Sequence, residues 1–226
     1  MKEGSTQIPL LGDELWFPPA TNASIDGLVA IGGDLSVQRL LLAYTSGIFP
    51  WFNEDTMILW WSPDPRMVLF PEKLKVSKSM RRLLKTDQFS ITKNRCFSEV
   101  VDACAKAIRP DQEGTWITAE MKDAYMALHE RRIAVSYEVW EGDRLVGGLY
   151  GVDLNGIFCG ESMFSIVSNA SKFAFIKMVE ELQAKNYAII DCQMYTEHLA
   201  SLGAETITRD AFLEILKTTL AHNGNN

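Results

Sequence analysis

The sequence predicts an α/β fold of the α+β type, in which a small, turn-rich first domain precedes a mixed β-sheet with packed helices. Three observations predict it. The first 66 residues are rich in Pro, Gly and Trp. Three segments between residues 134 and 164 then have strand-like patterns and are joined by short turns. Helix, strand and helix patterns follow, and antiparallel hairpins that lead into a helical crossover are typical of a mixed sheet.

The first domain has one clear helical pattern. The segment VQRLLLAYTSG follows Ser36, which is a good N-cap residue, and ends at Gly47, which suits a helix C-terminus. The proline-rich run SPDP interrupts regular structure soon afterwards. We therefore predict two domains, residues 1–66 and residues 67–226.

The second domain contains a longer series of elements. MVLF and FSIT are predicted as short strands, and SEVVDACAKAI and AEMKDAYMALHER as helices, the second capped by Thr118. AVSYEVW, RLVGGLYGVD and IFCGESMF form a meander, with a turn at Asn155 and Gly156. A long helix, ASKFAFIKMVEELQAKN, is predicted to be capped by Asn169, and the strand AIIDCQ and the helix RDAFLEILKTTLAH follow it.

This order of elements agrees with a GNAT-like mixed sheet. Acyl-CoA-binding members of that fold hold pyrophosphate at a glycine-rich loop that opens the helix after the meander, because free N–H groups there suit an anion. Here the junction reads SMFSIVSNASK and contains no glycine. An acetyl-CoA-dependent enzyme is therefore disfavoured.

Composition is that of an ordinary globular protein, with 47% hydrophobic and 23% charged residues in 226. The segment MKEGSTQIPLLGDELWFPP lacks the pattern of a secretory signal, and no apolar run approaches the roughly 20 residues that span a membrane. We expect a cytoplasmic protein that does not enter a membrane. The four cysteines form no C-x-x-C pair and the three histidines are dispersed, so we expect reduced cysteines and no metal site.

The net charge of −7 hides one basic region. Eight basic residues and one acidic residue lie between Lys73 and Arg95. Four of them have the spacing of one helix face, which we call the basic stripe: Lys78, Arg81, Arg82 and Lys85. Such a stripe is either a solvated helix face or a contact for nucleic-acid phosphates, and its position in an acidic chain favours the second interpretation.

Two further patterns have both a structural and a functional interpretation. In IIDCQ, strand alternation places Asp191 and Gln193 on one face, either as an internal hydrogen-bonded pair or as a site that faces Glu161. Glu161 itself lies among apolar and small residues without a nearby positive partner, although a buried carboxylate needs one. The face of the long helix that carries Phe175 and Met178 is expected to be core on spacing alone.

Eight segments, in order, give the chain its resemblance to a known family: GLVAIGGDLSVQRLLLAYTSGIFPWF, ILWWSPDPRMVL, TWITAEMKDAYMALH, LVGGLYGV, FCGESMFS, NASK, IIDCQ and HLASLGA. Together they closely resemble leucyl/phenylalanyl-tRNA–protein transferases. The resemblance extends from residue 27 to residue 204. It implies a bacterial aminoacyltransferase with a small N-terminal domain and a GNAT-like C-terminal domain.

The resemblance also implies the reaction. Such enzymes move Leu or Phe, and Met less well, from aminoacyl-tRNA to the N-terminal Arg or Lys of acceptor proteins, which marks them for N-end rule degradation. No cofactor or metal is implied, and a monomer is expected. The partners are therefore Leu-tRNA or Phe-tRNA and proteins with a basic N-terminal residue.

The resemblance assigns roles to particular positions. Asp191 and Gln193 match the catalytic centre, and Glu161 is expected to bind the cationic N-terminal residue of the acceptor. Trp51 and Trp116, which otherwise are packing residues or stacking platforms for bases, match tryptophans near the terminal adenosine. The basic stripe matches the positive patch under the tRNA acceptor stem. The apolar pocket for the transferred side chain matches Leu149, Phe158, Met163, Phe175, Met178, Leu182 and Ile190.

The expected chemistry needs mainly alignment, because an aminoacyl ester is already activated. The acceptor amine must lose a proton while the carbonyl oxygen gains charge. We expect Gln193 to orient the amine, since a neutral amide is a very weak base, and Asp191 or the adenosine hydroxyls to manage the proton. Two other classes of protein remain: a GNAT-like acetyltransferase would bind CoA tightly, and a non-catalytic RNA-binding protein would bind tRNA regardless of its aminoacyl group.

Overall fold

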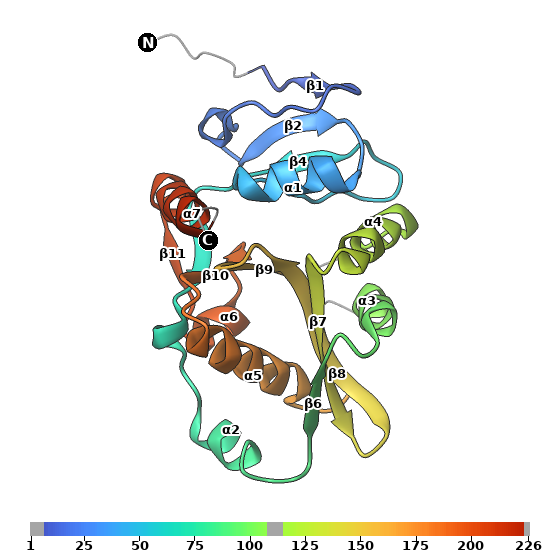
Figure 1. Cartoon of the computed structure of the whole chain (residues 1–226), viewed down its shortest axis with the longest axis vertical. Coiled ribbons are helices and arrows are strands. Elements are labelled where there is room, and N and C mark those ends of the chain that lie inside the picture. Colours follow the sequence, from blue (N-terminus) through green and yellow to red (C-terminus); the bar gives the residue numbers. More distant parts are fainter. Residues whose placement is uncertain (1–6, 108–114, 224–226) are drawn as a thin grey trace.

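The computed structural model describes residues 7–107 and 115–223, which form two β-sheets and the helices around them (Figure 1). The first sheet has the strand order β1-β2-β4-β3. Its strands are short: β1 (Leu10–Leu11), β2 (Leu28–Gly32), β3 (Phe49–Pro50) and β4 (Leu59–Trp61). β1 runs parallel to β2, and the other pairs are antiparallel.

The second sheet has seven strands in the order β11-β5-β10-β9-β8-β7-β6. The strands are β5 (Arg66–Leu69), β6 (Ser90–Lys93), β7 (Ala134–Glu141), β8 (Arg144–Asp153), β9 (Ile157–Ser165), β10 (Ile189–Gln193) and β11 (Glu205–Ile207). β10 runs parallel to β9 and antiparallel to β5, so the sheet is mixed as predicted. This arrangement places the C-terminal end of β10 between the start of β5 and the middle of β9.

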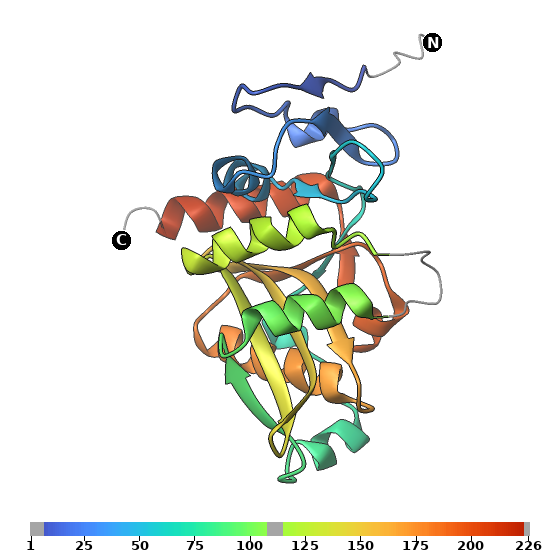
Figure 2. The same ribbon diagram turned by 90° about the vertical axis from the view of Figure 1, so that its right-hand side faces the viewer.

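Helices cover both faces of the second sheet (Figures 1 and 2). α3 (Phe97–Lys106) and α4 (Ala119–Glu130) lie on one face, and α5 (Ala170–Ala184) lies on the other. The remaining helices are α1 (Val37–Thr45), α2 (Lys78–Leu83), α6 (Glu197–Ser201), α7 (Arg209–Asn223) and the 3-10 turns η1 (Ala20–Asn22) and η2 (Pro71–Lys73). The predicted mixed sheet with packed helices is confirmed.

The two sheets are joined through α1, α4 and α7. Helix α1 packs against both α4 and α7 (Figure 1). Gly47 follows α1 with φ of +76°, and a Cβ atom there would lie 2.5 Å from the side chain of Leu213 in α7. A glycine is therefore required both for its left-handed backbone and for the close approach of α7.

Most local predictions for the second sheet and its helices are confirmed. Ser36 and Thr118 accept capping hydrogen bonds from the N–H groups of Arg39 and Met121. Asn169 is the N-cap residue of α5, as predicted, although it has φ of 69° and its side chain makes no capping hydrogen bond. The short strands of the first sheet, β11 and α6 were not predicted, since segments of two to five residues show too little periodicity. The division into domains 1–66 and 67–226 stays a prediction.

Candidate active site

Glu161 projects from β9 into a set of three neutral hydrogen-bond donors, which we call with it the Glu161 cluster. The Tyr44 hydroxyl donates to Oε1 at 2.9 Å, and the Tyr125 hydroxyl donates to Oε2 at 2.6 Å. The side-chain amide of Gln193 donates to Oε1 at 3.0 Å. The donors come from α1, α4 and the end of β10, so the cluster depends on the packing of both sheets.

The hydrogens available to this cluster depend on the charge of Glu161. The two tyrosine hydroxyl oxygens also lie 2.9 Å from each other, so the carboxyl group and the two phenols form a closed ring of three contacts. Two phenols supply only two hydrogens. When Glu161 is ionised, both point at the carboxylate and the contact between Tyr44 and Tyr125 lacks a hydrogen. A proton on Glu161 would complete the ring.

The electrostatics agree with that geometry. Burial raises the pKa of Glu161 to about 7, against the lowering effect of the hydrogen bonds from Tyr125 and Tyr44. Burial also raises the pKa of both phenols well above the usual value, and the charge of Glu161 adds to this. Glu161 is half-buried rather than sealed. It is therefore a carboxyl group that is not completely enclosed and whose pKa lies near neutral pH.

Asp191 lies beside this cluster but is held by Arg66. The Arg66 Nε–H and Nη2–H donate to the two carboxylate oxygens at 2.8 and 2.7 Å. Both side chains are only 1% exposed. The two alternatives for Asp191 and Gln193 each hold in part: the Gln193 N–H is hydrogen-bonded to Asp191 and the Gln193 side chain contacts Glu161, whereas Asp191 forms a buried ion pair with Arg66.

A bulge at the end of β10 explains the difference. The pairing with β5 shifts between Asp191 and Gln193, and Gln193 has a left-handed backbone with φ of 63°. Strand alternation therefore no longer holds at this position. The Gln193 N–H donates to Asp191 Oδ1 at 3.0 Å, while the Gln193 side chain reaches Glu161.

The residues that the family resemblance assigns to an aminoacyl pocket lie together. All of them belong to or pack against one hydrophobic cluster under α5, and six are at most 3% exposed, Met163 being only partly buried. This apolar cluster comprises residues from α5 and from strands β8, β9 and β10. It includes Ile190, and Cys192, which precedes Gln193, packs against it. The structure brings the predicted pocket residues together, whereas their role as a binding site stays a prediction.

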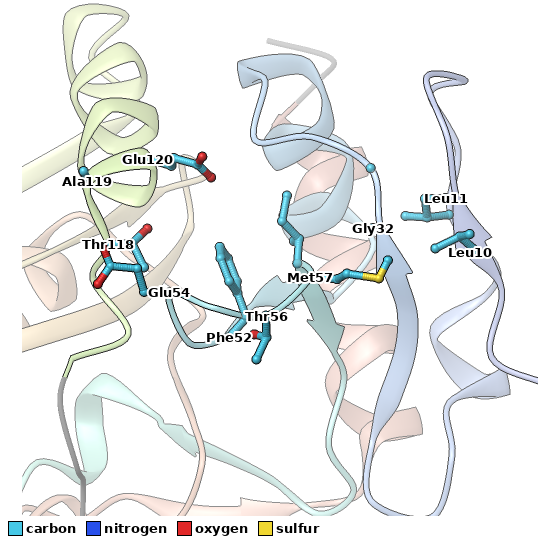
Figure 3. A pocket seen from close by; sticks show the side chains of 12 residues that line it. Leu10, Leu11, Gly32, Phe52, Glu54, Thr56, Met57, Thr118, Ala119 and Glu120 are labelled. Carbon is cyan, nitrogen blue, oxygen red and sulfur yellow. The ribbon is translucent and has the colours of Figure 1, made fainter.

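The two predicted adenosine-binding tryptophans differ in exposure. Trp51 is 38% exposed and lies against Trp61, with ring centroids 6.0 Å apart. Trp116 is 8% exposed and precedes α4. A pocket of about 640 Å³ opens nearby, between the first sheet and the start of α4, and includes Phe52 and Thr118 in its lining (Figure 3). None of the predicted site residues lines it.

The basic stripe is exposed, as predicted, but it extends past its helix. Lys78, Arg81 and Arg82 lie on α2, whereas Lys85 lies in the turn that follows, because α2 ends at Leu83. Met80 on the opposite side is buried. Within the described residues, ion pairs engage Lys73 and Lys93 of the same basic region but none of the stripe. The stripe lies at the end of the molecule far from the first sheet (Figure 1).

Sequence reasoning missed Arg66, Tyr44 and Tyr125. They lie 125, 117 and 36 residues from the groups that they contact, so no local spacing could connect them. Arg66 had one signal: it is a charged residue at the start of an apolar strand, where burial requires a partner.

The cysteine, histidine and acidic side chains show where disulfides or metal sites could form. The four cysteines form no disulfide with one another; Cys104 and Cys159 are buried, and Cys96 and Cys192 are half-buried. Across residues 7–107 and 115–223, no group of His, Cys, Asp or Glu could hold a metal ion. The same residues contain no helix long and apolar enough to cross a membrane.

Solved structures with a similar arrangement are distant. The GCN5-related N-acetyltransferase from Kribbella flavida is 9% identical, with a TM-score of 0.39, and the alignment covers 74% of this chain and 60% of its own. L-PGS from Bacillus licheniformis is 12% identical with a TM-score of 0.37, over 76% and 57% of the two chains. Scores at this level support no conclusion about function.

Sequence comparisons are far closer. The profile of the leucyl/phenylalanyl-tRNA protein transferase matches residues 68–217, and the profile of its N-terminal domain matches residues 33–64. The leucyl/phenylalanyl-tRNA–protein transferase of Christiangramia forsetii is 58% identical over 88% of this chain and 95% of its own length. That of Flavobacterium johnsoniae is 56% identical over 91% and 97%. The chain therefore belongs to the leucyl/phenylalanyl-tRNA–protein transferase family.

Proposed function

We propose that this protein transfers Leu or Phe, and Met less well, from aminoacyl-tRNA to the N-terminal Arg or Lys of acceptor proteins, which enter N-end rule degradation. The observation that carries the proposal is the Glu161 cluster. Among the described residues, the hydrogen-bond donors to Glu161 are all neutral, so its negative charge is available for a cationic ligand. An acceptor with an N-terminal Arg or Lys supplies such a cation beside its reactive amine.

The acceptor side chain would place the amine next to Gln193. Since the Gln193 amide already donates to Glu161, its carbonyl oxygen is the acceptor that remains for an N–H of the incoming amine. The same residue thus contacts the carboxylate that binds the side chain and the group that reacts. We assign Glu161 to recognition and Gln193 to orientation of the nucleophile.

The donor would bind on the other side of Gln193. The apolar cluster of Leu149, Phe158, Met163, Phe175, Met178, Leu182 and Ile190 offers a dry environment for a Leu or Phe side chain. Trp51 and Trp116 are proposed to hold the terminal adenosine. The exposed basic stripe of Lys78, Arg81, Arg82 and Lys85 is proposed to contact phosphates of the tRNA.

The transfer step then balances without a cofactor. The α-amine nitrogen attacks the ester carbonyl carbon, and the new C–N bond replaces the bond to the ribose oxygen of the terminal adenosine. The amine loses one proton, and the leaving ribose oxygen takes up one proton. Most of the rate is expected from alignment of the two substrates. These substrates are cytoplasmic, and we propose a monomer in that compartment.

Transfer of radiolabelled leucine from Leu-tRNA tests the proposal. Label should reach a peptide that begins with Arg or Lys, and not the same peptide that begins with Ala. The variant Glu161→Ala should lose the transfer while it still binds Leu-tRNA. If tRNA bound equally well with and without its leucine, and neither peptide gained label, the protein would be an RNA-binding protein instead.

The basic stripe has its own test. Removal of Arg81 and Arg82 together should weaken tRNA binding and make it less dependent on salt, because each phosphate contact steepens the fall of log K with log salt, by about 0.9 in B-DNA and about 0.7 in single strands. The matched control replaces Lys177 of α5 and Lys185 at its C-terminus, which pair with Glu180 and Glu181. Equal salt slopes in both variants would contradict the assignment.

A further inference from the structure

Arg66 connects the candidate active site to the packing of the whole molecule. We propose that Arg66 is a positioning residue for the transfer reaction: through Asp191 it fixes the backbone of Gln193, and so the place where Gln193 meets the acceptor amine. The inference rests on the proposed function. It concerns a residue that contacts neither the Glu161 carboxylate nor the expected path of the substrates.

Four elements hold the Arg66 guanidinium. Its Nη1–H donates to the carbonyl oxygen of Gly47 at 3.3 Å, just after α1. The guanidinium carbon lies 4.8 Å from the ring centroid of Phe49 in β3 and 4.5 Å from that of Phe212 in α7. Asp191 in β10 occupies the remaining side. The group therefore has one position, which is set by parts of both sheets.

The contact passes from Arg66 to Gln193 through a single carboxylate. Asp191 Oδ1 accepts one hydrogen bond from Arg66 Nε and another from the Gln193 N–H, at 2.8 and 3.0 Å. The second bond stabilises the left-handed backbone of Gln193, which is uncommon for a residue other than glycine. Without a fixed carboxylate, the Gln193 N–H would lose the acceptor that holds it in this conformation.

Arginine suits this position better than lysine. A planar guanidinium can donate two parallel hydrogen bonds to one carboxylate and can lie flat between two aromatic rings. Lysine would supply one point charge, which leaves the carboxylate free to rotate. The arrangement thus predicts that the shape of the cation matters, and not its charge alone.

The same contacts narrow the roles open to Asp191. Its two oxygens accept three hydrogen bonds, and a proton on either oxygen would compete with the buried ion pair. Asp191 therefore positions Gln193 and does not accept the proton of the acceptor amine. The proton is left to the hydroxyl groups of the substrate.

The variant Arg66→Lys separates positioning from stability. The single-turnover rate of transfer should fall by about 100-fold, since a misplacement of 1 Å can cost that much. The acceptor KM and the affinity for Leu-tRNA should change by less than about threefold, because Glu161 and the basic stripe are intact. Variant Phe212→Leu, which loosens one side of the guanidinium and leaves the ion pair, should show a smaller loss of the same kind.

Arg39 provides the matched control. It is as buried as Arg66, at 0% exposure, and it pairs with Asp34 and donates to the carbonyl oxygens of Gly12 and Glu14. Variant Arg39→Lys should lower the melting temperature but keep the single-turnover rate when measured below that temperature. An equal loss of rate in both lysine variants would overturn the positioning role.

The double variant Arg66→Lys with Asp191→Asn tests the path of the effect. If Arg66 acts through Asp191, the double variant is no slower than the slower single variant, whereas independent effects multiply. Multiplied losses, or a folded Arg66→Lys variant at the wild-type rate, would overturn the inference. Absence of transfer by the wild-type protein would instead overturn the proposed function.

Discussion

Two glutamates, Glu161 and Glu138, are held by neutral donors, yet their surroundings differ. Glu138 in β7 is fully buried and its oxygens lie 2.5 Å from the Ser136 hydroxyl and 2.6 Å from that of Thr92. These partners come from β7 and the adjacent β6. Glu161 is half-buried, and its partners come from α1, α4 and β10.

The difference teaches how to tell a structural carboxylate from a functional one. The contacts of Glu138 form within one strand pair and would form wherever β6 and β7 meet. Those of Glu161 require α1, α4 and the end of β10 to be in place, and they leave the residue half-buried. A polar group assembled from distant segments is the better candidate for recognition, because local folding alone does not require it.

Isosteric changes should separate the two residues most clearly. Glu161→Gln should reduce kcat/KM for an Arg-peptide by about 30-fold to 100-fold, because a charge-assisted pairing is worth about 2–3 kcal/mol. Glu138→Gln should leave kcat/KM within about twofold and instead lower the free energy of unfolding by about 1–2 kcal/mol. Transfer assays give kcat/KM and urea unfolding gives the stability of both variants. A large loss of kcat/KM in Glu138→Gln, with little loss in Glu161→Gln, would refute the distinction.

The pH dependence of acceptor binding should depend on Glu161. Because its pKa is raised to about 7, the carboxylate is mostly protonated at pH 6 and mostly ionised at pH 8. The KM for an Arg-peptide should therefore fall as pH rises through 7, by up to about tenfold. In Glu161→Gln the fall of KM around pH 7 should disappear, and only the pH dependence that comes from the acceptor amine should remain. If KM fell in the same way in that variant, a group other than Glu161 would be responsible for the pH dependence.

The tyrosines allow a finer test. The hydrogen bonds from Tyr125 and Tyr44 lower the pKa of Glu161, so Tyr125→Phe should raise it and move the pH profile to higher pH. At pH 7 the acceptor KM should rise by about threefold to tenfold. Ser136→Ala, which removes the corresponding donor to Glu138, should leave the profile where it is. Coincident profiles for Tyr125→Phe and the wild type would contradict the proposed coupling.

Stability should show the smallest effect. The pKa of Glu161 is higher in the folded state than its ordinary value of 4.5, so the folded protein binds more protons between about pH 4.5 and 7. The stability that protonated Glu161 contributes is present below this window and is lost as pH rises through 7. The melting temperature of Glu161→Gln relative to wild type should thus increase by a few degrees from pH 5 to pH 8. A difference independent of pH would contradict the raised pKa.

Much of the second sheet could be predicted because its strands are long and regular. β8 was placed at its observed bounds, since alternation and the flanking turns define it on both sides. The first sheet was missed because its strands are short and interrupted by Gly and Pro. The course of the chain at Gln193 could not be predicted either: period-2 alternation assumes a regular strand, and the bulge there depends on the fixed position of Asp191.

The candidate site was predicted only in part for a related reason. Glu161, Asp191 and Gln193 are polar residues within otherwise apolar strand segments, so they could be recognised from the sequence as candidate site residues. Tyr44, Tyr125 and Arg66 lie in segments that look like ordinary amphipathic or apolar structure. Their roles depend on tertiary packing, which no local pattern encodes.

The packing of Phe212 against the Arg66 guanidinium has a consequence for folding during synthesis on the ribosome. Phe212 is synthesised after every other residue of the arrangement around Arg66 and Glu161. Chains generally fold from the N-terminal side as they emerge. When Glu161 and Gln193 have emerged from the ribosome, the Arg66 guanidinium still lacks the Phe212 ring that packs against it. We therefore expect the chain to become active only after α7 has been synthesised.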